Sequence, residues 1–190
     1  MKKILVLNGS PRKNGATASL IKAFVEGASA SGNEIREAYI HGMEIRNCLG
    51  CDSCMRTHAG CVQKDEGMAK IYEDLAWCDV IVFASPVYFG YLTAQLKTVI
   101  DRMWAWFNLP GNFGIKKQIV LISTARGTDY SAVLDQYGIY SKFIANLDRP
   151  FHFFCSSMTL LNAAGSSCIM FSSPRIETRS SFINTGIFKA

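Results

Sequence analysis

The segment at residues 8–18 carries more polar chemistry than a simple turn requires. It reads Asn-Gly-Ser-Pro-Arg-Lys-Asn-Gly-Ala-Thr-Ala and lies between a short apolar run and a helical pattern. A helix N-terminus offers unpaired backbone N–H groups and a partial positive charge. Small residues let several of these groups converge on one oxyanion, and Ser10, Arg12 and Thr17 add hydroxyls and a charge. The segment predicts a phosphate-binding loop; an ordinary capped turn is the structural alternative.

The spacing of the glycines in this loop indicates which kind of phosphate ligand it would bind. The chain lacks Gly-x-x-x-x-Gly-Lys-Ser/Thr here, which argues against a nucleoside triphosphatase. It also lacks Gly-x-Gly-x-x-Gly, the usual dinucleotide fingerprint. A terminal monophosphate therefore fits the loop better than a pyrophosphate.

Two further segments favour a flat heterocycle beside that phosphate. Residues 85–90, Ser-Pro-Val-Tyr-Phe-Gly, follow a buried apolar run. The backbone N–H groups of Val87 to Gly90 can bond the polar edge of a ring, and Tyr88 and Phe89 can stack on it; a cluster of core aromatics is the alternative. Residues 124–128, Thr-Ala-Arg-Gly-Thr, again combine hydroxyls, a cation and a glycine, although this signal is weak by itself.

Four of the seven cysteines lie within fourteen residues. Cys48, Cys51, Cys54 and Cys61 have the spacing C-x2-C-x2-C-x6-C. Such a density of thiolates suits an iron–sulfur cluster, whereas structural zinc more often separates its two cysteine pairs by a longer loop. Zinc, free thiols or partial disulfides stay open as alternatives. The other three cysteines lie in apolar settings and are expected to pack as small hydrophobic residues.

Alternating strand and helix patterns position these segments. Apolar runs predict strands at 3–8, 34–40, 79–84 and 115–124, and either 152–155 or 168–171 supplies a fifth. Helical patterns cover 16–30, the stretch after Asp65, 92–107 and 129–146. This order predicts an α/β fold with a doubly wound, parallel five-stranded sheet and helices on both faces. In such sheets ligands bind beyond the carboxyl ends of the strands, where all three polar loops fall.

The length and composition of the chain limit the number of domains and the classes of partner that we expect. The 190 residues suit one domain, 1–190, with 49% hydrophobic residues and a net charge of +5. That charge is scattered and too small to indicate nucleic acid. The chain shows no pattern typical of a secretory leader or a membrane span, so we expect a cytoplasmic protein without nucleic-acid or membrane partners.

Taken together, the three loops resemble those of the flavodoxin-like NAD(P)H-dependent FMN reductases, closest to the iron–sulfur flavoprotein branch. The resemblance covers about residues 3–145. It implies a flavodoxin-like fold and an FMN phosphate held through Ser10, Arg12 and Thr17. The cofactor contacts that it implies are Ser10, Arg12, Asn14, Gly15, Ala16, Thr17, Pro86, Val87, Tyr88, Phe89, Gly90, Thr124, Ala125, Arg126 and Gly127. It also implies a [4Fe-4S] cluster on Cys48, Cys51, Cys54 and Cys61. Two departures are Ala16, where the family often has asparagine, and the region after residue 150.

The expected function is an FMN-dependent oxidoreductase. It passes reducing equivalents from NAD(P)H, or from a protein donor, to an unidentified small-molecule or protein acceptor. Because the flavin carries the chemistry, no catalytic side chain is expected. The alternatives are a flavodoxin-type electron carrier without turnover and a zinc-binding module without flavin. A homodimer or homotetramer is expected, with residues 104–113 as the candidate interface.

Overall fold

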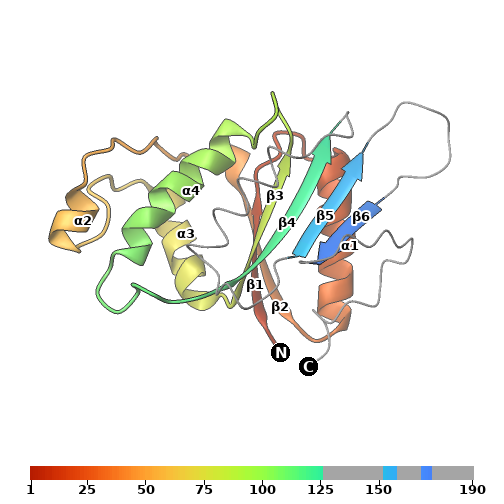
Figure 1. The fold of residues 1–190 in the computed structure, drawn as a ribbon, viewed down its shortest axis with the longest axis horizontal. Coiled ribbons are helices and arrows are strands. Elements are labelled where there is room, and N and C mark those ends of the chain that lie inside the picture. Colours follow the sequence, from red (N-terminus) through yellow and green to blue (C-terminus); the bar gives the residue numbers. More distant parts are fainter. Residues whose placement is uncertain (126–151, 158–167, 173–190) are drawn as a thin grey trace.

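In the part of the chain that the structure describes, six strands form one sheet at the centre of the molecule (Figure 1). The computed structural model describes residues 1–125, 152–157 and 168–172, with side chains described for the first of these ranges. The strands lie in the order β2-β1-β3-β4-β5-β6. Their bounds are β1 Lys3–Asn8, β2 Glu34–Tyr39, β3 Val80–Pro86, β4 Gln118–Ala125, β5 His152–Ser157 and β6 Cys168–Ser172. Strands β1 to β5 pair in parallel, and β6 is antiparallel to β5.

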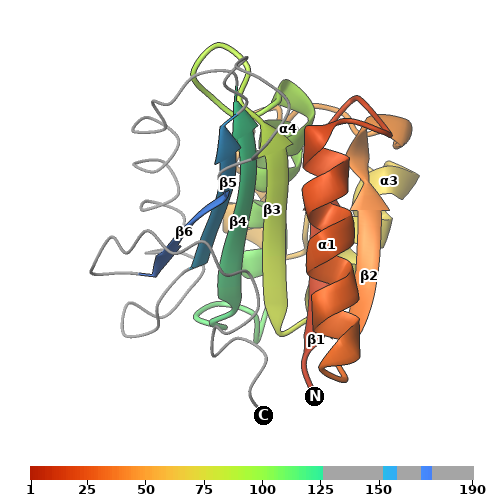
Figure 2. The ribbon, with the colours of Figure 1, turned by 90° about the vertical axis from the view of Figure 1, so that its right-hand side faces the viewer.

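Helices cover both faces of the sheet (Figure 2). Helix α1, Ala16–Ala30, packs on one face, while α3, Glu66–Trp77, and α4, Ala94–Phe107, pack on the other. Two short elements, η1 Ile40–Gly42 and α2 Ser53–Thr57, lie in the connection between β2 and α3. None of the helices in the described part of the chain is long and apolar enough to cross a bilayer.

The continuous apolar runs reflect burial on both faces of each central strand. In β1, Ile4 and Val6 join the core under α1, whereas Leu5 and Leu7 join the core under α3 and α4. Side chains alternate between the two faces of a strand, so a strand covered on both sides needs apolar residues at every position. The sequence pattern therefore specified the central strands correctly.

The predicted α/β, doubly wound fold class is confirmed, but the strand count needs correction. Five strands were expected, whereas the described residues contain six, because each of the two candidates for the last strand forms a strand. β5 continues the parallel sheet, and β6 pairs back on it as an antiparallel edge, a common addition to parallel sheets. The helix expected at 129–146 lies outside the described residues.

The topology fixes where the strand order reverses. β1 lies between β2 and β3, so the connections leaving β1 and β2 run in opposite directions along the sheet. Asn8 and Ala84 are the last pair of residues between β1 and β3. The loops that follow β1 and β3 therefore leave the sheet side by side at the switch point, where doubly wound folds bind ligands.

Candidate functional site

The loop after β1 is held in shape by its own side chains. The buried Ser10 hydroxyl accepts a hydrogen bond from the Arg12 N–H and donates one to the Arg12 carbonyl, both at 3.2 Å. The Ser10 N–H donates to Asn8 Oδ1 at 3.1 Å. From β2, the Tyr39 hydroxyl donates to the Pro11 carbonyl at 3.0 Å. These bonds make Ser10 a residue that shapes the loop, whether or not it also contacts a ligand.

Gly9 lets this loop approach α4 closely. A Cβ at this position would lie 2.7 Å from Leu96 Cβ and 2.9 Å from Thr93 Oγ1, which leaves no room for a side chain. Thr93 Oγ1 in turn donates to the Gly9 carbonyl at 2.7 Å. The loop after β1 is thereby fixed to the start of α4.

Helix α1 begins without a side-chain cap. Gly15 is its N-cap residue and supplies no side-chain hydrogen bond. The first-turn amides of Ala16, Thr17 and Ala18 have no intrahelical acceptor, since helix bonds begin one turn later. An uncapped helix N-terminus beside small residues and the exposed cation Arg12 has the donors that a phosphate requires. The residues present thus fit a phosphate group, and the Ala16 amide is one of the donors available to it.

Thr17 and Thr124 form a buried hydroxyl pair, with 2.8 Å between their Oγ1 atoms. The two residues come from α1 and β4 and are separated by 107 positions in the chain. Thr124 was expected to border the ring. That expectation stays a prediction; the Thr124 hydroxyl meets Thr17 on the α1 side of the sheet, whereas Ala125 packs toward the α3 and α4 side. The pair orients the Thr17 hydroxyl at the start of α1.

Replacing Thr124 with valine is expected to weaken FMN binding about 5- to 10-fold, while the melting temperature falls little. The change is nearly isosteric and removes one partner of a buried hydrogen bond, a loss of about 1 kcal/mol. Fluorescence titration with FMN measures the effect. Thr98→Val is the matched control, because Thr98 bonds Asn47 Oδ1 on the flank of α4, away from the loops. Equal weakening in both variants would contradict the role given to the pair.

The loop after β3 makes a tight turn. The Tyr88 N–H donates to the Tyr91 carbonyl at 2.8 Å and the Tyr91 N–H donates back at 3.1 Å. Phe89 and Gly90 between them have positive φ angles of 50° and 77°, as a type I′ turn requires. Glycine adopts this conformation readily, whereas a phenylalanine there is strained.

The turn at residues 88–91 limits which backbone N–H groups are free to bond the edge of a bound ring. All four amides from Val87 to Gly90 were expected to be available. The Val87 N–H instead donates to the Thr124 carbonyl at 2.7 Å, and the Tyr88 N–H closes the turn. The amides of Phe89 and Gly90 remain as candidate donors. The Phe89 side chain is fully exposed, Tyr88 is partly exposed, and Pro86 precedes them at the end of β3.

Sequence reasoning missed two residues that join these loops. The Ser85 hydroxyl accepts from the Thr93 N–H at 3.0 Å and donates to the Pro86 carbonyl at 2.8 Å. Thr93 is the N-cap of α4 and also bonds Gly9, so one buried hydroxyl pair ties β3, α4 and the loop after β1 together. A threonine just before a helical pattern was the available signal. Arg126 and Gly127, also expected in the site, lie outside the described residues.

The cysteine-rich connection lies at a distance from these loops, near α2 and the second half of α4 (Figure 1). Cys48 and Cys51 are exposed, and Cys54 and Cys61 are partly buried. Burial raises the pKa of the Cys54 thiol above its ordinary value, and the nearby Cys61 and Cys48 add to this rise. Within residues 1–125 no three metal-binding side chains gather into a site. The donor chemistry suits a thiolate-bound centre, but the described geometry does not assemble one.

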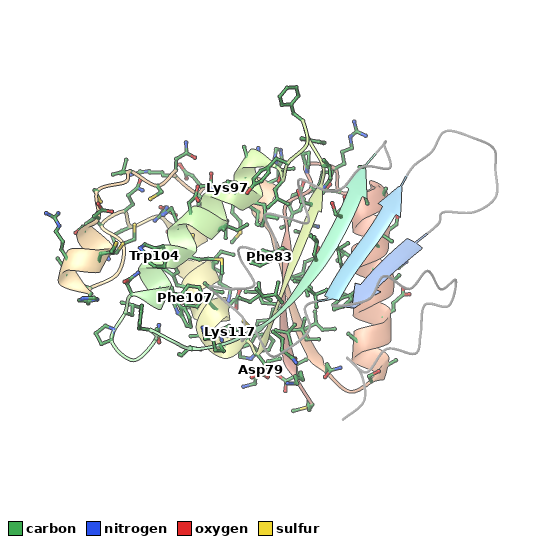
Figure 3. The ribbon with its side chains drawn as sticks, viewed as in Figure 1. Asp79, Phe83, Lys97, Trp104, Phe107 and Lys117 are labelled. Atoms are coloured by element: carbon green, nitrogen blue, oxygen red, sulfur yellow. The ribbon has the colours of Figure 1, made fainter. Side chains whose placement is uncertain are left out.

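Cys78, His58 and the two tryptophans of α4 differ in their burial and contacts. Cys78 is buried, which raises the pKa of its thiol to about 11 and keeps it protonated, as expected of a packing residue. His58 Nδ1 lies 2.9 Å from the Asn108 carbonyl. On α4, Trp106 is buried, whereas Trp104 is partly exposed in the half of the helix nearest α2 (Figure 3).

Comparison with known proteins agrees with the fold and identifies a family. A family model described as NADPH-dependent FMN reductase matches residues 2–137. An iron-sulfur flavoprotein of Methanocaldococcus jannaschii is 37% identical over 100 residues, which cover 53% of this chain and 50% of that protein. One from Archaeoglobus fulgidus is 33% identical over 136 residues, covering 69% of this chain and 65% of its own length. The chain thus spans between half and two thirds of these relatives.

Solved structures share the fold at low sequence identity. An NAD(P)H:quinone oxidoreductase from Methanothermobacter marburgensis superposes with a TM-score of 0.55 at 21% identity, covering 75% of this chain and 72% of its own. The flavoenzyme FerB, an NAD(P)H:acceptor oxidoreductase from Paracoccus denitrificans, superposes with a TM-score of 0.55 at 17% identity. The superposition covers 86% of this chain and 78% of FerB. At these identities the likeness concerns the arrangement of strands and helices.

Proposed function

Because this chain belongs to the NADPH-dependent FMN reductase family, we propose that it binds FMN at the carboxyl ends of β1, β3 and β4. We propose further that it transfers reducing equivalents from NADH or NADPH to an acceptor. The observation that carries the proposal is the uncapped N-terminus of α1, with the buried Thr17–Thr124 pair beside it. Anionic ligands bind where several amides and an oriented hydroxyl converge, and FMN ends in a single phosphate.

Each loop has a role in this proposal. The phosphate is held by the first-turn amides of α1, by the Thr17 hydroxyl and by Arg12, with Asn14 and Gly15 forming the rim. Ser10 keeps the loop in the required shape through its bonds to Arg12. The ring lies along residues 86–90, where the amides of Phe89 and Gly90 face its polar edge. Ala125, Arg126 and Gly127 border its other side.

When bound, FMN supplies hydride and electron transfer at its ring, and the protein supplies position and electrostatics. Backbone N–H donors near the polar edge stabilise negative charge there without any titratable side chain. Tyr88 and Phe89 offer apolar surface that excludes water from the ring once a ligand covers them.

A [4Fe-4S] cluster on Cys48, Cys51, Cys54 and Cys61 is the proposed second centre. The printed names of the relatives and the C-x2-C-x2-C-x6-C spacing support it. Because the thiols do not converge in the described geometry, the segment has to close around the metal, as thiolate sites commonly do on binding. A cytoplasmic homodimer or homotetramer, without nucleic-acid or membrane partners, completes the proposal.

Anaerobic purification followed by heating is expected to release one FMN per chain, identified by its chromatographic retention and absorbance. The reduced-flavin spectrum should then appear on mixing with NADPH or NADH. Iron and sulfide assays on the same sample report the cluster, and a zinc assay reports the alternative metal. A purified protein that neither contains FMN nor binds added FMN would overturn the flavin proposal. A flavin-loaded protein reduced only by a protein donor would instead favour an electron carrier.

A further inference from the structure

Asn8, the last residue of β1, has a buried side-chain amide whose two ends have different partners. Its Oδ1 accepts the Ser10 N–H at 3.1 Å, and its Nδ2 donates to the Glu37 carboxylate at 2.8 Å. A backbone N–H can only donate, and a carboxylate can only accept. Turning the amide over would therefore place donor against donor at Ser10 and acceptor against acceptor at Glu37. Both partners require the same orientation of the Asn8 side chain.

Glu37 reaches this amide from β2, the strand next to β1. Side chains alternate between the faces of a strand, and Ile35 packs into the core under α1, so Glu37 lies on the α1 face as well. Its register partner on β1 is Val6, which places Asn8 diagonally across from it, within reach of a long side chain. Glu37 is exposed. A surface residue of β2 thus contacts a buried residue at the base of the loop after β1.

The hydrogen bonds continue from Asn8 to the start of α1. The Ser10 hydroxyl holds both the N–H and the carbonyl of Arg12. The same Arg12 carbonyl accepts the Gly15 N–H at 3.4 Å, and Gly15 is the N-cap residue of α1. A continuous series of hydrogen bonds therefore runs from Glu37 on β2 to the helix N-terminus where a phosphate is proposed to bind.

A carboxylate suits the outer end of this series. It bonds the Asn8 amide more strongly than a neutral acceptor does, because it carries charge. A donor in its place would favour the opposite orientation of the amide, with the NH2 group against the Ser10 N–H. Ser10 is buried, so its N–H would then lack an acceptor, which is unfavourable away from water. The shape of the loop thus depends on a residue outside the loop.

We propose that Glu37 is a positioning residue for the phosphate of the flavin. It acts through Asn8: its carboxylate fixes the amide, and the amide holds the loop after β1 in the shape that presents the first-turn amides of α1. The preference for FMN over riboflavin, the same flavin without its phosphate, depends in part on this contact. The inference rests on the flavin part of the proposed function and adds a residue that lies outside the three loops.

Glu37→Lys tests the role, with Glu34→Lys as the matched control. Glu34 is also exposed on β2, at the end of the strand away from the loop. Both changes replace a negative charge by a positive one, which by itself favours a phosphate ligand. Glu37→Lys should nevertheless raise the dissociation constant for FMN about 5- to 10-fold, as expected for the loss of one hydrogen bond. Its affinity for riboflavin should stay unchanged, and Glu34→Lys should bind FMN at least as tightly as the unmodified protein.

Glu37→Gln separates the orientation of the amide from the charge. The glutamine Oε1 can still accept from Asn8 Nδ2, so FMN affinity should stay within about 2-fold of the unmodified protein. Fluorescence titrations with FMN and with riboflavin measure all three variants. Unchanged FMN affinity in Glu37→Lys, or equal losses for FMN and riboflavin, would overturn the inference. An unmodified protein that binds neither flavin would overturn the flavin proposal.

A measurement without flavin keeps these two outcomes apart. Amide hydrogen exchange at Ser10 is followed by NMR in the full chain before any flavin is added. Glu37→Lys should speed this exchange at least about 5-fold, because the Ser10 N–H loses its oriented acceptor, whereas Glu34→Lys should leave it unchanged. Equal exchange at Ser10 in Glu37→Lys and the unmodified protein would overturn the inference whether or not FMN binds.

Discussion

Replacing Thr17 with leucine is expected to raise the dissociation constant for FMN roughly 30- to 150-fold. Thr17 is buried at the first turn of α1, and its hydroxyl is oriented by Thr124. The change removes one hydroxyl bond to a charged group, worth about 1.5–3 kcal/mol, and places a larger apolar side chain where the phosphate is proposed to lie. Equilibrium dialysis or fluorescence titration with FMN measures the loss, and Ser10→Leu should act in the same direction by collapsing the loop.

The control for this prediction is His58→Asn. His58 lies at the end of α2 with a positive φ of 51°, a conformation that asparagine also adopts. It contacts the Asn108 carbonyl and has no recorded bond to the three loops. FMN retention in this variant should equal that of the unmodified protein. If Thr17→Leu and His58→Asn retain FMN equally, the phosphate site has been placed wrongly.

Replacing Asp65 with alanine is expected to lower the free energy of unfolding by about 3–5 kcal/mol. The carboxylate is buried, pairs with the fully buried Arg102, and caps α3 by accepting the Met68 N–H at 3.1 Å. The variant leaves an uncompensated buried guanidinium and removes a helix cap worth about 1 kcal/mol. Urea denaturation followed by circular dichroism measures the change.

Glu66→Ala is the matched control for the loss of an acidic residue at this helix end. Glu66 is the exposed first residue of α3 and makes only the favourable interaction of an acidic side chain with the helix dipole. Its removal should lower stability by no more than about 1 kcal/mol. A similar loss in both variants would mean that Asp65 acts as a helix-terminal charge and that its bond to Arg102 contributes nothing.

The features that the sequence predicted are those formed by residues close together in the chain. The phosphate loop, the turn at 85–90 and the cysteine spacing are local patterns, and so are the apolar runs that became β1, β3 and β4. Such patterns are visible because a strand buried on both faces, or a helix with one buried face, imposes its own period on neighbouring residues. From them followed the fold class, the edge of the sheet that carries the loops, and the resemblance to FMN reductases.

The pairing of distant residues was decided by the tertiary structure. Thr124 meets Thr17 across 107 positions, and the Val87 amide is taken by the Thr124 carbonyl. Arg102, which no local pattern distinguishes, donates from α4 to Arg46, Gln63 and Asp65 in the connection between β2 and α3. A hydrogen bond of this kind depends on how two elements pack, and no local period records it. The sequence alone thus determined which segments are predicted to carry the chemistry, and only the packing of α1, β4 and α4 decided which of their atoms remain free for that proposed role.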